Sequence, residues 1–123
     1  MLAVPPTTRP LFSSNSEPPL LTTPRITRFR ALVAKQPTNE LFLFSLAQAL
    51  DAAEELTEAE THYRACVETK TDWMLPRILL GKLLLKTGRK AEAKSLLEGA
   101  LWLAVDQDHD DPAMELRELL KTF

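Results

Sequence analysis

The sequence predicts an all-α fold, a right-handed helical repeat (α-solenoid), and two observations carry that prediction. The first is a pattern of apolar and small residues that is written twice, thirty-four residues apart, between Leu46 and Ala104. The second is a series of helix-start and helix-stop signals that divides the chain into segments of helical length. A fixed period of this size is typical of repeat architectures, in which stacked helix pairs share one continuous core.

Small residues of the first copy return as small residues in the second, and large apolar residues return as large ones. The first copy holds Leu46, Ala47, Leu50, Ala59, Tyr63 and Cys66, and the second holds Leu80, Gly81, Leu84, Ala93, Leu97 and Ala100. This pattern resembles the tetratricopeptide repeat (TPR), a helix–turn–helix unit of about 34 residues. The resemblance covers residues 37–105 and implies a small stand-alone TPR-like protein. The chain departs from the family pattern at Glu54, where the second copy has the turn glycine Gly88.

Residues 1–22 are expected to form a disordered tail, and the helical domain to span residues 23–123. The tail is rich in proline and serine, a composition that supports neither a helix nor a strand ladder. No basic residue precedes Arg9 and the apolar start is short, so a secretory signal peptide is not predicted. No apolar run approaches the roughly 20 residues that a membrane-spanning helix needs, so we expect no membrane span.

The first helix is predicted over residues 24–36. Thr23 and Pro24 suit an N-cap followed by the first helical position, and Ile26 and Phe29 follow at helical spacing. We interpret this segment as the second helix of a preceding half-repeat. Its arginines are expected to form a solvated face.

Repeat one is expected over residues 37–70, with Thr38 and Asn39 capping a helix that runs to about residue 53. Thr57 followed by Glu60 predicts a capping box at the start of its second helix. Repeat two is expected over residues 71–105.

In repeat two, Thr71 and Asp72 are expected to begin the first helix, where Pro76 is tolerable because it lies in the first turn. Gly88 suits a helix stop in the left-handed conformation. Asp111 and Pro112 then predict a capping helix over residues 112–122, which would cover the end of the solenoid.

Composition and charge argue against several classes of function. The net charge of −2 gives no reason to expect nucleic acid as a partner. The only cysteine, Cys66, fits a reducing compartment, so we expect a cytoplasmic protein. The sequence contains no phosphate-binding glycine loop, nucleophile elbow or metal-spaced Cys/His set. We therefore expect no enzymatic activity, no cofactor and no catalytic or metal-binding residues.

Three local patterns have a functional and a structural interpretation. His62 and Cys66 share a helix face, but Cys66 falls at a small packing position, which favours an unreactive thiol. The acidic run from Asp106 to Asp111 resembles the opening of a calcium loop but lacks its glycine and its closing glutamate. We therefore expect a linker in which Asp111 caps the last helix. Trp102 lies on the polar face of its predicted helix. It is either an interaction residue or a residue packed under the last helix.

In TPR proteins, the first helices of successive repeats line a concave groove that holds a peptide or a partner helix. The resemblance implies a partner protein or peptide. We expect an apolar groove whose side chains are at least partly exposed without a ligand, and we expect no membrane partner. The alternative is a self-associating scaffold subunit, such as a homodimer, whose groove is filled by its own tail or by another protomer. The groove positions are Leu41, Phe44, Gln48 and Asp51 in the first copy and Leu75, Ile78, Lys82 and Leu85 in the second.

Overall fold

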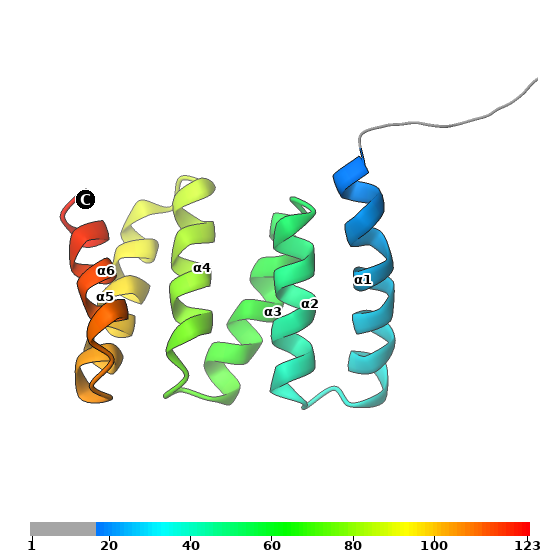
Figure 1. Ribbon diagram of the computed structural model, residues 1–123, viewed down its shortest axis with the longest axis horizontal. Helices are drawn as coiled ribbons and strands as arrows, with labels where there is room; N and C mark the ends of the chain where they lie inside the picture. Colours follow the sequence, from blue (N-terminus) through cyan, green and yellow to red (C-terminus); the bar gives the residue numbers. More distant parts are fainter. Residues whose placement is uncertain (1–16) are drawn as a thin grey trace, which may run out of the picture.

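The protein is an open row of α-helices with no strand among residues 17–123, the part of the chain that the computed structural model describes; side chains are described from residue 24 onward. Successive helices run antiparallel, and each packs on its neighbours in the chain (Figure 1). The fold is thus an all-α solenoid, as predicted. The helices are α1 (Glu17–Lys35), α2 (Glu40–Ala52), α3 (Leu56–Thr69), α4 (Met74–Lys86), α5 (Lys90–Asp106) and α6 (Asp110–Leu120).

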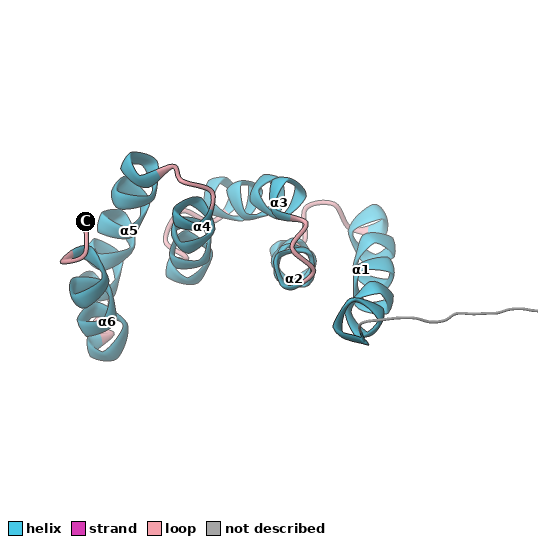
Figure 2. Cartoon of the chain, turned by 90° about the horizontal axis from the view of Figure 1, so that it is seen from above, coloured by secondary structure: helices cyan, strands magenta, loops and turns pink. Residues whose placement is uncertain are grey.

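The row of helices is curved (Figure 2). Seen from above, α2, α4 and α6 lie on one side of the row, while α3 and α5 lie on the other. The end helices α1 and α6 bend towards the side of α2 and α4, which is therefore the concave side. Repeat one consists of α2 and α3, and repeat two consists of α4 and α5.

The first helix begins earlier than the sequence predicted. It starts at Glu17 and carries Pro24 in its interior, whereas we expected a tail up to residue 22. Pro18 and Pro19 directly follow Glu17, in the first turn, where backbone N–H groups have no partner within the helix. Proline is therefore compatible with the start of this helix. The rest of the predicted tail, residues 1–16, lies outside the described residues.

The turn inside each repeat has one backbone geometry. Glu54 and Gly88 both adopt positive φ, at 63° and 82°. The next residue in each turn donates its N–H back into the preceding helix: Glu55 to the Leu50 carbonyl, and Arg89 to the Leu84 carbonyl. The left-handed stop predicted at Gly88 is confirmed, and Glu54 reproduces it without glycine. Asp108, before α6, has φ 59° and the same pattern of bonds.

Among the described helices, only α2 has the side-chain cap that we predicted for it. Asn39 Oδ1 accepts from the backbone N–H of Leu41 at 3.0 Å and of Phe42 at 3.2 Å. The other predicted caps are wrong, and a left-handed turn residue precedes α3 and α6 instead. Thr57 and Asp111 lie inside α3 and α6, and the residues before α3, α4 and α6 make no capping bond with their side chains.

The core is built where helices cross at small residues. Ala47, Ala59, Ala93 and Ala100 are all fully buried. At Gly81, a Cβ atom would lie only 2.7 Å from the Leu97 side chain, so α4 and α5 approach closely there. This confirms that the repeated small residues set the packing distance between helices.

The repeat period also appears in ion pairs between helices that are two apart in the chain. Arg30 of α1 pairs with Glu58 of α3, and Arg64 of α3 pairs with Glu92 of α5 at 2.6 Å. Both partners of the second pair lie thirty-four residues after those of the first. Arg30 is thus not merely solvated, as the sequence suggested, but part of a repeated bridge between neighbouring units.

Candidate binding groove

The surface of the concave side comes from equivalent positions of α2 and α4. These helices bury their other faces against neighbours, so their more exposed side chains point to the concave side. The spacing is i, i+4, i+7 and i+11, which keeps one face of a helix. We call these eight positions the concave stripe: Leu41, Ser45, Gln48 and Ala52 from α2, and Leu75, Leu79, Lys82 and Lys86 from α4.

The structure places the predicted groove residues in two different environments. Leu41 and Leu75 are 63% and 44% exposed. Gln48 and Lys82 are also exposed, whereas Asp51 and Leu85 are half-buried. These residues are on or beside the concave stripe, and their role as ligand contacts stays a prediction.

Phe44 and Ile78 do not have the partial exposure that we expected, because they are only 8% and 9% exposed. The Phe44 ring lies 4.9 Å from the Trp73 ring and 6.1 Å from the Tyr63 ring, centre to centre. This aromatic cluster joins α2, α3 and the turn before α4. Phe44 is therefore a core residue rather than an open groove contact.

Sequence reasoning missed four residues of the concave stripe: Ser45, Ala52, Leu79 and Lys86. The reason is one step of helical register. The residue three positions after Leu41 is Phe44, which is buried, whereas the residue four positions after Leu41 is Ser45, which lies on the concave stripe. Tyr63, already predicted to face inward, was the available signal, because aromatic side chains that lie close together gain from tilted ring packing.

The carboxyl-terminal ends of α2 and α4 form a polar corner of the groove. Tyr63 Oη donates a hydrogen bond to Asp51 Oδ2 at 3.0 Å, and Lys86 Nζ lies 3.4 Å from the other Asp51 oxygen. Burial and the adjacent Asp51 charge raise the pKa of Tyr63, so its phenol remains a donor. Gln48 and Leu79 complete a hollow of about 310 Å³ here. The groove is thus apolar at one end and polar at the other.

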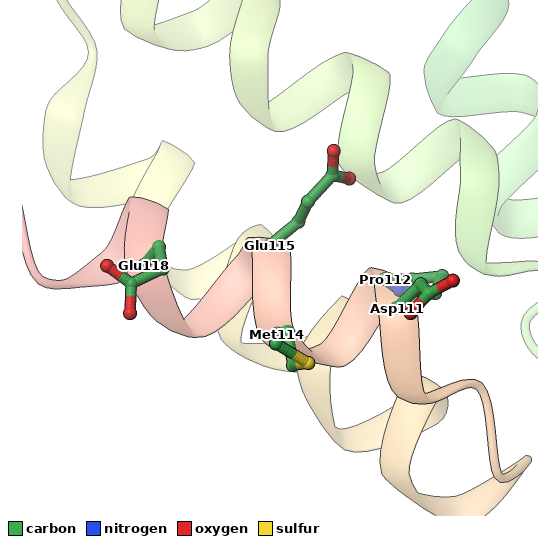
Figure 3. Close-up of a pocket in the computed structure, with 5 residues that line it drawn as sticks. All are labelled: Asp111, Pro112, Met114, Glu115 and Glu118. Carbon is green, nitrogen blue, oxygen red and sulfur yellow. The ribbon is translucent and has the colours of Figure 1, made fainter.

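The α6 helix adds one acidic side chain, Glu115, to the concave surface. Figure 3 shows Glu115 extending from α6 towards α4, while Met114 and Glu118 point away from it. Glu115 and Lys82 line a hollow of about 180 Å³ between these two helices. Asp111, Pro112, Met114, Glu115 and Glu118 line a larger hollow of about 560 Å³ along α6.

The residues considered for chemistry do not form a reactive site. Cys66 is fully buried, and burial, aided by the charge of Glu40, raises the pKa of its thiol to about 11. His62 lies 3.8 Å from Glu58. Within residues 17–123, no three metal-ligating side chains gather at one point. In the same part of the chain, no helix has the length and apolar character to cross a membrane.

Trp102 does not pack under the last helix. It is 66% exposed and lines a hollow of about 610 Å³, together with Arg77 and Gly99 among others. The structural alternative for Trp102 is therefore wrong.

Comparison with known proteins identifies the fold. The sequence matches no family model and no curated protein. The type III secretion translocator chaperone SycD of Yersinia enterocolitica superposes with a TM-score of 0.78 at 18% identity, over 83% of this chain and 71% of that chain.

Two further solved structures have the same helical fold. A chain of the CopN–Scc3 complex gives a TM-score of 0.72 at 25% identity, over 76% of this chain and 56% of that chain. The TPR2B domain of yeast Sti1, solved in complex with pHsp70, gives 0.71 at 13% identity, over 86% and 95%. The resemblance to the TPR fold seen in the sequence is therefore confirmed by the structure.

Proposed function

We propose that this chain is a protein-interaction module that binds a segment of a partner protein along the concave stripe. The observation that carries the proposal is the exposure of two leucines, Leu41 and Leu75, at equivalent positions of neighbouring helices. Large apolar side chains placed together on a concave surface lose contact with water when a partner covers them, which favours association.

The two ends of the groove indicate the class of segment that fits. Leu41 and Leu75 offer apolar contacts towards the amino-terminal ends of α2 and α4, and Leu79 lies near the middle of α4. Gln48, Lys82 and Lys86 offer polar contacts further along the same helices. An amphipathic helix, or an extended segment with apolar anchors at one end, would match this division.

The similar solved structures support the proposal by analogy. The Sti1 domain was solved with pHsp70, the CopN–Scc3 structure is a complex, and SycD is a chaperone. These are properties of those proteins. For this chain, they favour partner binding over enzymatic activity, and we propose no catalytic residue.

The test compares groove variants with a matched control. Leu41→Glu/Leu75→Glu places two carboxylates on the concave stripe. Thr61→Glu/Ser95→Glu places two on exposed positions of α3 and α5, also thirty-four residues apart. Proteins captured from the native cell by the wild-type chain are identified by mass spectrometry, and a synthetic segment of the captured protein is then titrated by calorimetry.

We expect the groove variant to bind that segment at least about thirtyfold more weakly, the effect of a 2 kcal/mol hot spot. The Thr61→Glu/Ser95→Glu control should bind like the wild type. Equal affinity of all three proteins would place the binding surface elsewhere, with the hollow beside Trp102 as the next candidate.

Self-association through the groove is the alternative function. A second SycD structure, an alternative dimer, supports this alternative by analogy. Light scattering of the same variants separates the two functions. A wild-type dimer that becomes a monomer only in Leu41→Glu/Leu75→Glu would mean that the groove is filled by another protomer.

A further inference from the structure

The outer face of α1, at one end of the solenoid, is basic. Residues 24–35 include four basic side chains and no acidic one. Arg30 is paired with Glu58, but no ion pair within the described residues involves Arg28 or Lys35. Arg28, Ala31 and Lys35 are exposed and follow one another at i, i+3 and i+7, so they share a helix face. Two charges thus flank a small apolar position.

The outer face of α6, at the other end, carries two carboxylates, Asp111 and Glu118, of which Glu118 also pairs with the exposed Lys121 at 2.8 Å. Asp111, Met114 and Glu118 are exposed and have the same i, i+3, i+7 spacing. Met114 is 62% exposed, so an apolar side chain lies between two carboxylates. Figure 3 shows Met114 and Glu118 pointing away from α4.

The two faces match in charge, spacing and shape. In each, the charged positions are seven residues apart, about 10 Å along a helix. Placed antiparallel, Asp111 would meet Lys35, Glu118 would meet Arg28, and Met114 would lie against Ala31. A small residue opposite a long flexible one permits close helix packing.

We propose that a second copy of this chain docks end to end, with the acidic face of α6 against the basic face of the partner copy's α1. The topology also favours this contact. α1 has the direction of α3 and α5, and α6 has the direction of α2 and α4. The sequence marks α1 as the second helix of a half-repeat. One copy's α6 and the next copy's α1 would therefore be antiparallel, like the two helices of a repeat.

The consequence is a head-to-tail assembly rather than a closed symmetric dimer, because the two contacting surfaces differ. This proposal concerns the ends of the solenoid and does not depend on partner binding in the groove.

Charge reversal tests the contact. One variant reverses α1 (Arg28→Glu/Lys35→Glu), and a second reverses α6 (Asp111→Lys/Glu118→Lys). Sedimentation velocity and light scattering measure the mass of the full chain over a concentration series at low salt. We expect the wild-type mass to rise with concentration from 13.8 kDa to at least twice that value. Each variant alone should remain at the monomer mass, and an equimolar mixture should associate like the wild type, because opposite charges then meet again.

The control Lys70→Glu/Lys94→Glu, at two exposed positions outside the concave stripe, changes the net charge as much as the α1 variant but leaves both end faces intact, and it should associate normally. Circular dichroism checks that all variants are folded, as expected for exposed positions. A wild-type chain that stays monomeric at every concentration would overturn the proposal. So would association that survives both single reversals, or a mixture that remains monomeric.

Discussion

Repeat one and repeat two share a backbone but fill it with different side chains. Where the two helices cross, repeat one has Ala47 and Tyr63, and repeat two has Gly81 and Leu97 at the equivalent positions. The turn that joins the helices has Glu54 in repeat one and Gly88 in repeat two, yet both residues have positive φ.

The difference shows which features the repeat requires. Small side chains at the helix crossing and a left-handed residue in the turn are kept. The residue types at these positions differ between the repeats. The helix caps differ too: Asn39 caps α2 with its side chain, whereas the equivalent Trp73 packs against Phe44. Substitutions at equivalent positions of the two repeats can test which of these differences matter for stability.

The largest effect should come from a charge placed in either helix crossing. Ala59→Glu and Ala93→Glu each bury a carboxylate at a fully buried position of equivalent packing. We expect each to lower the free energy of unfolding by more than about 4 kcal/mol, enough to unfold much of the chain. Circular dichroism melting measures the loss, with Thr61→Glu as an exposed control. A cooperative wild-type-like melt for one of them would show that the repeats are not packed alike.

Phe44 and Leu41 should separate core from groove within one helix. Phe44→Ala removes a ring from the aromatic cluster and should cost about 3–5 kcal/mol. Leu41→Ala trims a side chain that is 63% exposed and should change stability by no more than about 0.5 kcal/mol. Chemical denaturation of both variants gives the two values. Similar costs would mean that Leu41 is held in the core and that the concave stripe is misplaced.

Gly81→Ala should be more damaging than the reverse change in repeat one. The new Cβ would meet Leu97 at 2.7 Å, so the helices must separate or Leu97 must move, at a cost of about 1–3 kcal/mol. Ala47→Gly creates no clash and should cost about 1 kcal/mol, from the lower helix propensity of glycine. Denaturation midpoints compare the pair. If Gly81→Ala is neutral or stabilising, the close approach of α4 and α5 is not a constraint.

The turns predict changes of opposite sign. Glu54→Gly should stabilise the chain by about 1 kcal/mol, since a side chain at positive φ is disfavoured there. Gly88→Ala should destabilise it by about 1 kcal/mol for the same reason, although open space surrounds that position. Thermal midpoints of both variants measure this, and a loss of stability in Glu54→Gly would contradict it.

The smallest effect should be a change in how the protein's stability depends on pH under acidic conditions. The hydrogen bond from Arg89 holds the pKa of Glu60 below its usual 4.5, and Arg30 likewise lowers the pKa of Glu58. This stabilisation is fully present above about pH 4.5 and is lost as the pH falls through the lowered folded-state values. Glu60→Gln should therefore reduce the fall in melting temperature between pH 5 and pH 3, at about the level of surface ion pairs. An unchanged pH profile would mean that the pair contributes nothing.

The sequence predicted the repeat, the small crossing residues and the stop at Gly88, because packing volume and positive φ restrict residue type strongly. It did not predict that α3, α4 and α6 begin without side-chain caps; a left-handed residue precedes α3 and α6, but none precedes α4. It placed Phe44 in the groove because a step of three and a step of four along a helix differ by only one residue. The pairing of Arg30 with Glu58 was also missed, although Arg64 and Glu92 repeat it thirty-four residues later.

The packing of each helix on its neighbours in the chain has a consequence for how the protein folds. Contacts of this kind are close in sequence, so little chain entropy is lost before they form, and folding should be fast, in the microsecond to millisecond range. Stability should then be graded along the row. The central helices are held from both sides and should protect their amides from hydrogen exchange longest, while α1 and α6, each held from one side, should open first.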